Sequence, residues 1–307
     1  MAQLECLTLA RGDLRFSARA IGRGPIALFL HGFPDTERTF DAQLQALAAA
    51  GFRAVAVRMR GYEPSSQPAD QDYRGIRMAE DVLCWIDQLG GGPVHLIGHD
   101  WGAIIAQIVA AQAPGKVTSL TVMAVPRLKP FGKLVRDDRR QAWRSLYGAF
   151  FQIPRLPEWR INRANFAYLE RLWRRWSPGW AIPPETLHEV RQAFAAPGVT
   201  RAALSYYRQA RDTRSHDGKS TARLLRAPLR VPTLGLCGAA DGCISADIFE
   251  RAMPEEDFPA GLRLHRIDSA GHFFQQEQPD KVSELLIDWL RANPGGIGEV
   301  HPALKRR

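Results

Sequence analysis

The sequence predicts an α/β fold with a mostly parallel central sheet, helices on both faces and an inserted all-helical cap. Strand-like apolar runs alternate with helical stretches over the first 127 residues and again after residue 229. Between them, residues 128–228 are rich in Arg, Trp, Phe and Tyr and show helical periodicity without convincing strands. We therefore expect a core made of residues 1–127 and 229–307, the second part including a C-terminal tail, and a cap made of residues 128–228.

The core elements are predicted from short apolar runs and from their glycine and proline boundaries. Strands are expected over residues 7–9, 14–18, 26–30, 52–57, 94–99, 117–125, 233–237 and 262–267. Helical spacing is found over residues 40–50, 78–88, 103–113 and 279–292. Strands that alternate with helices of this length are typical of a parallel sheet covered on both faces.

The cap is predicted as a series of helices separated by prolines. Helical periodicity covers residues 134–151, 161–176, 184–195 and 200–212. A helical block that interrupts a parallel sheet is best explained as a lid, because such lids bury a reacting centre and gate access to it.

The sequence gives expectations for membrane association, cellular location and the state of the cysteines. No apolar run reaches the roughly 18–20 residues that span a bilayer. The first six residues show no basic segment followed by an apolar run, so we expect no signal peptide and a cytoplasmic location. The four cysteines, Cys6, Cys84, Cys237 and Cys243, form no C-x-x-C motif, which favours reduced thiols.

Charge limits the partners. The formal net charge is +9, but the arginines are dispersed along the sequence, with local clusters at Arg139-Arg140 and Arg174-Arg175. Nucleic-acid binding requires the charge on one face with interleaved aromatic residues, so nucleic acid is not an expected partner. We expect a small apolar substrate, and the chain could also form a homodimer.

The most informative motif is Gly98-His99-Asp100-Trp101-Gly102. It follows a buried strand and precedes a helix, as the nucleophile elbow G-x-S-x-G does, but Asp100 stands in place of the serine. The dipole at the start of a helix favours an ionised carboxylate. A carboxylate displaces a leaving group from saturated carbon and leaves an alkyl ester on the enzyme. Epoxides and alkyl halides are therefore the expected substrates.

A base and its orienting acid are expected later in the chain. His272, in Ser269-Ala270-Gly271-His272-Phe273, lies after a late strand and before the last helix, and would activate water to hydrolyse the ester. Asp241 follows the strand over residues 233–237 and precedes His272, which is the expected chain order. A carboxylate on Nδ1 would fix the imidazole tautomer.

The tetrahedral intermediate of ester hydrolysis carries an oxyanion that needs N–H donors. The backbone N–H groups of Trp101, after the nucleophile, and of Phe33, after His31-Gly32, are the expected pair. The segment His31-Gly32-Phe33-Pro34 follows a buried strand, as a loop that crosses near the site would.

Together these residues resemble the α/β-hydrolase superfamily, and within it the soluble epoxide hydrolases and the related haloalkane dehalogenases. The resemblance covers essentially the whole chain and implies the α/β-hydrolase fold with a helical cap and no cofactor or metal. It also implies a nucleophile at Asp100, an acid at Asp241, a base at His272, oxyanion donors at Phe33 and Trp101, and substrate contact at His31.

Epoxide hydrolases resemble one another in using cap tyrosines to hydrogen-bond and protonate the epoxide oxygen. The segment Leu204-Ser205-Tyr206-Tyr207-Arg208 is similar to the late-cap motif, so Tyr207 is the expected acid and Tyr206 its neighbour in the substrate site. At the early-cap position the family's tyrosine is replaced by Phe150. Tyr147, one helical turn earlier, points to roughly the same face and could substitute.

Haloalkane dehalogenases resemble one another in holding the halide with two N–H donors. Trp101 could supply one indole, but the usual Asn after His-Gly is Phe33 here. A cap tryptophan could serve instead, namely Trp143, Trp173, Trp176 or Trp180. We expect an epoxide hydrolase that forms a vicinal diol, with a dehalogenase or other hydrolase, or a non-catalytic small-molecule binder on the same fold, as alternatives.

Overall fold

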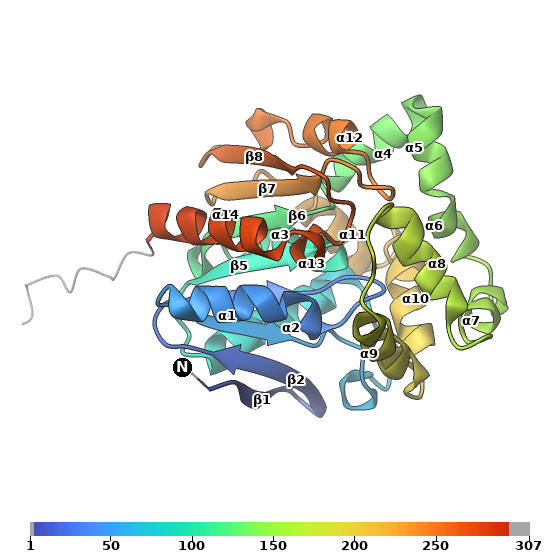
Figure 1. Cartoon of the computed structure of the whole chain (residues 1–307), viewed down its shortest axis with the longest axis horizontal. Coiled ribbons are helices and arrows are strands. Elements are labelled where there is room, and N and C mark those ends of the chain that lie inside the picture. Colours follow the sequence, from blue (N-terminus) through green and yellow to red (C-terminus); the bar gives the residue numbers. More distant parts are fainter. Residues whose placement is uncertain (1–2, 295–307) are drawn as a thin grey trace, which may run out of the picture.

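The computed structural model describes residues 3–294, so the predicted C-terminal tail beyond residue 294 lies outside the described residues. Its centre is one eight-stranded sheet in the order β1-β2-β4-β3-β5-β6-β7-β8 (Figure 1). The strands are β1 Glu5–Arg11, β2 Leu14–Ile21, β3 Ile26–Leu30, β4 Arg53–Val57, β5 Val94–His99, β6 Val117–Met123, β7 Thr233–Gly238 and β8 Leu262–Ile267.

The sheet is mostly parallel, as predicted. Strands β4, β3, β5, β6, β7 and β8 pair in parallel, while β2 runs antiparallel to both β1 and β4. Every residue of β5 is buried, because this central strand is covered on both faces. The carboxyl ends of β5, β7 and β8 therefore meet at one edge of the sheet, where Figure 1 shows the cap.

Helices cover both faces of the sheet, which confirms the predicted layers. Helices α1 Asp41–Ala49 and α14 Pro279–Ala292 contact each other on one face and bury a core with Leu44, Leu286 and Trp289. On the other face lie α2 Gly75–Gln88, α3 Trp101–Gln112 and α12 Ala246–Arg251. Short helical turns connect these elements, namely η1 Glu37–Phe40, η2 Pro64–Ser66, η3 Pro114–Lys116, η4 Glu255–Asp257 and α13 Phe274–Glu277.

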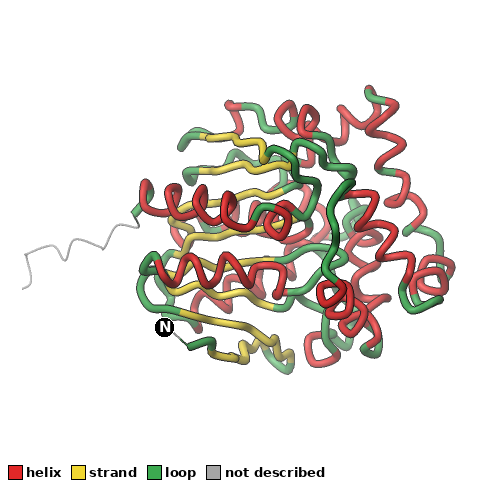
Figure 2. Tube along the Cα trace, viewed as in Figure 1, coloured by secondary structure: helices red, strands yellow, loops and turns green. Residues whose placement is uncertain are grey.

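Residues 128–228 contain helices and no strand, and they cover the carboxyl edge of the sheet (Figure 2). The helices are α4 Leu128–Asp137, α5 Arg139–Arg144, α6 Leu146–Phe150, α7 Leu156–Ile161, α8 Ala167–Trp176, α9 Pro184–Ala195, α10 Val199–Gln209 and α11 His216–Leu224. We call them the cap.

Two of the predicted cap helices are wrong in extent. The stretch 134–151 is three helices, because the Asp138 carboxylate accepts hydrogen bonds from the N–H groups of Arg140 and Gln141 and starts a new helix. The stretch 161–176 is interrupted after Ile161, where residues 164–166 adopt positive φ angles of 49–58°. Helices α11 and α12 have no counterpart among the predicted elements.

Candidate active site

Asp100 lies in a sharp turn between β5 and α3, with a φ of 52° that side-chain-bearing residues rarely adopt. The two flanking glycines are required sterically. A Cβ on Gly98 would overlap the backbone of Gly102, and a Cβ on Gly102 would overlap the carbonyl oxygen of Leu30. The turn therefore places the Asp100 side chain at the edge of the sheet under the cap, as the elbow motif predicts.

The two carboxylate oxygens of Asp100 have different surroundings. Oδ1 accepts a hydrogen bond of 2.7 Å from the backbone N–H of Phe33. Oδ2 lies 3.6 Å from Nε2 of His272, which is an ion-pair distance but beyond a direct hydrogen bond. The backbone N–H of Trp101 opens α3 and so has no intrahelical acceptor. Oδ1 thus contacts one of the two predicted oxyanion donors, Phe33, and Oδ2 faces the histidine.

His272 and Asp241 form a buried pair beside Asp100. The Nδ1–H of His272 donates to Oδ2 of Asp241 at 2.8 Å, while Oδ1 of Asp241 accepts from the N–H groups of Cys243 and Ile244. Burial alone would lower the pKa of His272, but the carboxylates of Asp241 and Asp100 outweigh it and raise that pKa to about 10. The contacts of His272 with Asp241 and Asp100 therefore favour the protonated imidazole.

Two further histidines near the site are neutral and bind backbone. The Nδ1–H of His31 donates to the carbonyl of Gly32, and its Nε2 accepts from the N–H of Met59. The Nε2–H of His99 donates to the carbonyl of His272. Burial lowers the pKa of His31 to about 4 and that of His99 to about 3. The predicted substrate contact of His31 does not fit this arrangement, since both ring nitrogens are occupied; His31 fixes the loop that carries Phe33.

The cap joins the loops that carry Asp241 and His272 through contacts that sequence reasoning did not predict. The carbonyl of Trp176 accepts from the N–H groups of both Gly242 and His272, at 2.9 and 3.0 Å. The Ser177 hydroxyl accepts from the N–H of Phe273 and donates to Glu277. No local sequence signal marks Trp176 or Ser177, because their partners are 66 to 100 positions away.

Two cap tyrosines line the same pocket as Asp100, namely Tyr207 on α10 and Tyr147 on α6. The Tyr207 hydroxyl is buried and makes no hydrogen bond of good geometry among residues 3–294, although the Trp101 side chain lies close enough to interact with it. The Tyr147 hydroxyl lies 3.4 Å from Sγ of Cys243. Burial raises the pKa of both phenols well above 10, with the Asp100 charge adding to the effect. Both phenols therefore keep their protons across the neutral range.

Two predicted substrate contacts lie elsewhere. The Tyr206 hydroxyl donates to the carbonyl of Arg60 at 2.6 Å, so it points into the core rather than into the pocket. Phe150 packs on Tyr168 and does not line the pocket. Its neighbour Phe151 is buried instead against the rings of Phe33, Tyr147 and Tyr207. Phe151, the residue that follows α6, therefore packs against the pocket residues in place of Phe150.

The pocket over Asp100 has a volume of about 450 Å³ and is mostly apolar. Its walls come from α3, α4, α6 and the end of α10, with Asp100 and Trp101 inside and the half-exposed Leu146 at its mouth. The other lining residues include Ile104, Val125, Leu128, Phe131, Val135, Ala149, Gln152 and Ile244. A cavity of this size and polarity fits a small apolar molecule.

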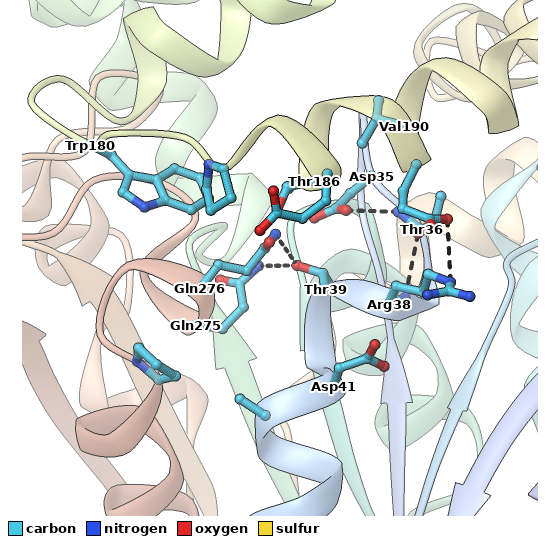
Figure 3. A pocket seen from close by; sticks show the side chains of 15 residues that line it. Asp35, Thr36, Arg38, Thr39, Asp41, Trp180, Thr186, Val190, Gln275 and Gln276 are labelled. Atoms are coloured by element: carbon cyan, nitrogen blue, oxygen red, sulfur yellow. Dashed lines mark hydrogen bonds and ion pairs between the residues drawn. The ribbon is translucent and has the colours of Figure 1, made fainter. Parts of the chain in front are cut away.

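A second cavity of about 340 Å³ lies where the cap meets the core, between α9 and the segment η1 to α1 (Figure 3). Its walls include Asp35, Thr36 and Trp180, but none of Asp100, Asp241 and His272. Burial raises the pKa of the Asp35 carboxyl to about 7.

Within residues 3–294 no group of three or more His, Cys, Asp and Glu side chains is arranged to hold a metal ion. No helix in that range is long and apolar enough to cross a bilayer.

Known proteins are similar to this chain over nearly its full length. The family model of the alpha/beta hydrolase fold matches residues 25–279. Epoxide hydrolase 4 of Mus musculus is 31% identical over 286 residues, which cover 91% of this chain and 77% of that protein. An epoxide hydrolase of Caballeronia sordidicola is 30% identical, with 88% of each chain covered.

Solved structures agree with the sequence comparisons. The crystal structure of epoxide hydrolase A from Mycobacterium thermoresistibile superimposes with a TM-score of 0.76 at 26% identity. The superposition covers 94% of this chain and 98% of that one. The fold and the family that the sequence predicts are therefore confirmed.

Proposed function

The chain belongs to the α/β-hydrolase fold family, among the epoxide hydrolases, and from that premise we propose that it opens an oxirane to a vicinal diol through an ester on Asp100. The nucleophile is Asp100, the base is His272 and the orienting acid is Asp241. The observation that carries the proposal is a carboxylate at the elbow facing two protonated phenols across one apolar pocket.

In the first step Oδ2 of Asp100 attacks an oxirane carbon while Oδ1 stays on the N–H of Phe33. A carbon–oxygen bond forms and the ring carbon–oxygen bond breaks. The electron pair moves to the ring oxygen, which accepts a proton from Tyr207 or Tyr147. An alkoxide is far more basic than a phenolate, so a phenol with a raised pKa still transfers its proton.

In the second step water attacks the ester carbonyl of residue 100. Forming the ester removes one of the two negative charges that raise the pKa of His272, so the imidazolium can return a proton to the phenolate that ring opening leaves. The neutral imidazole, held by Asp241, then takes a proton from water. The charge that develops on Oδ1 is stabilised by the N–H groups of Phe33 and Trp101. When the tetrahedral intermediate collapses, the bond from the carbonyl carbon to the alkyl oxygen breaks, that oxygen takes the proton from His272, and the diol is released. The Asp100 carboxyl then returns its proton to His272, which restores the starting state.

The phenols favour an epoxide over a halide substrate. A halide site needs two N–H donors, and Trp101 can supply one. The indole of Trp173 is occupied, since it donates to the carbonyl of Pro34 at 2.9 Å. The buried indole N–H of Trp176 has no partner within the described residues, so it keeps dehalogenation as a second candidate function.

A substrate panel tests the proposal. Wild type and Asp100→Asn are incubated with styrene oxide, 1-bromobutane and p-nitrophenyl acetate. We expect diol from styrene oxide with wild type only. Halide release without diol would assign the dehalogenase function. Ester hydrolysis that survives Asp100→Asn, or tight binding without any turnover, would overturn the proposal.

A further inference from the structure

The cap carries an exposed apolar surface that lies mostly outside the candidate active site. Six large hydrophobic side chains are exposed among residues 3–294, and all but Leu4 lie between residues 143 and 159. They are Trp143, Leu146, Ile153, Leu156 and Trp159, exposed by 67, 48, 44, 44 and 54%. Figure 1 shows α5, α6 and α7, which carry or flank them, along the outer edge of the cap. We call this surface the cap rim.

The cap rim is also strongly basic. Residues 128–163 contain nine Lys and Arg and three Asp and Glu, which gives them +6 of the chain's +9. Seven of these basic side chains are exposed, namely Lys129, Lys133, Arg136, Arg139, Arg140, Arg155 and Arg163. The exposed basic side chains and both exposed tryptophans therefore come from the same segment of the cap. Arg163 lies 4.6 Å from the ring centre of Trp159.

The mouth of the active-site pocket opens within the cap rim. Leu146 and Ala149 are exposed and also line the pocket over Asp100. Helix α4 also connects the pocket to this surface. Its apolar residues Leu128, Phe131 and Val135 line the pocket, while its basic residues are exposed. An apolar molecule that enters the pocket thus passes over this surface.

We propose that the cap rim docks the protein on an anionic phospholipid bilayer, with the pocket mouth toward the lipid. Tryptophan prefers the interface between lipid and water, and Lys and Arg attract anionic headgroups. The surface has both, arranged on short helices that can lie in the plane of the interface. Docked in this way, the pocket would draw its apolar substrate from the membrane.

The charge argues against a second copy as the occupant. A two-fold dimer through the cap rim would place the +6 segment of one chain against the same segment of its partner. Such like-charge contact is unfavourable. A protein partner of any kind would also cover the pocket mouth, whereas a fluid bilayer leaves a path for apolar molecules.

Vesicle sedimentation tests the proposal and needs no turnover, so its result does not depend on the proposed function. The full chain is mixed with vesicles of phosphatidylcholine, or of equal parts phosphatidylcholine and phosphatidylglycerol. We expect binding about tenfold stronger to the anionic vesicles, and weaker at high salt. Brominated acyl chains should quench part of the tryptophan emission.

Variants locate the surface. Trp143→Ser combined with Trp159→Ser, and Arg139→Glu combined with Arg140→Glu, should each remove most of the binding. Arg23→Glu combined with Arg251→Glu makes the same change of charge at two exposed positions outside the cap, and this variant should keep its vesicle binding. Thermal unfolding checks that each variant is folded.

Three results would overturn the proposal. The first is no preference for anionic vesicles. The second is an equal loss of binding in the Arg23 and Arg251 control, which would mean that net charge alone acts. The third is a dimer in solution that the tryptophan variant dissociates, which would assign the surface to a second copy.

Discussion

The imidazole of His272 is bound on one side and open on the other. Its Nδ1 lies 2.8 Å from Oδ2 of Asp241, while its Nε2 lies 3.6 Å from Oδ2 of Asp100. The first distance fixes the tautomer and the ring orientation. The second leaves Nε2 facing the carbon that becomes an ester carbonyl in the proposed mechanism. The carboxylates of Asp241 and Asp100 both favour the protonated imidazole, so a change at Asp100 is expected to change the pKa of His272.

Removing the Asp100 charge should lower the pKa of His272. In wild type that pKa is raised to about 10 against the effect of burial. In Asp100→Asn only Asp241 remains to raise it, so the pKa should fall toward the neutral range. NMR titration of the ring proton measures it, with His272→Gln to assign the signal. An unchanged pKa in Asp100→Asn would show that Asp100 does not control this proton.

Each pocket phenol should be needed for ring opening. Tyr207→Phe and Tyr147→Phe are each expected to slow single-turnover ester formation by about 10²-fold, the usual contribution of a general acid. Burst kinetics with styrene oxide measure this step. Tyr206→Phe is the matched control, since its hydroxyl donates to Arg60 and not into the pocket. Full activity in Tyr207→Phe, or an equal loss in Tyr206→Phe, would contradict the assignment.

Ser177 should act as a positioning residue for His272. Its hydroxyl joins Phe273 to Glu277, so Ser177→Ala frees the loop that carries the base. We expect kcat to fall about tenfold with little change in KM, because the pocket itself is unaltered. Ser205→Ala removes a hydroxyl that hydrogen-bonds only within α10, so it should leave both kcat and KM unchanged. A change confined to KM in Ser177→Ala would indicate a role in binding instead.

Asp35 should make stability fall as pH rises. Burial raises the pKa of its carboxyl from 3.8 to about 7 in the folded protein. A group of this kind favours folding below its unfolded pKa, and that stability is lost as pH rises through about 7. Asp35→Asn should therefore be more stable than wild type at pH 8, by about 4 kcal/mol, and gain little at pH 4.

Urea unfolding at the two pH values measures this difference. Asp288→Asn, at an exposed position on α14, serves as the control and should show no such dependence. Equal effects of Asp35→Asn at both pH values would mean that Asp35 is charged throughout.

The sheet and the elbow were predictable because their signals are local. Apolar runs bounded by Gly and Pro mark each strand, and the glycines around Asp100 are fixed by steric contact with the backbone. The predicted order of Asp100, Asp241 and His272 brings the three residues together at one sheet edge. Their catalytic roles stay predictions, as do the homodimer and the cytoplasmic location.

The cap was predicted less completely because its details depend on tertiary contacts. Apolar periodicity continues through Asp138, and only the capping hydrogen bonds divide the helix there. Which of Phe150 and Phe151 faces the site depends on the short helix α6. The hydrogen bonds of the Trp176 carbonyl and the Ser177 hydroxyl join segments that are far apart in the sequence, so no local pattern could predict them.

A single turnover in ¹⁸O-labelled water tests the central claim most directly. The protein is used in excess over styrene oxide, and the peptide that contains residue 100 and the diol are analysed by mass spectrometry. If Asp100 is the nucleophile, one ¹⁸O appears in its carboxylate and the first diol carries only ordinary oxygen. Label found in the first diol, with the peptide unlabelled, would contradict the account.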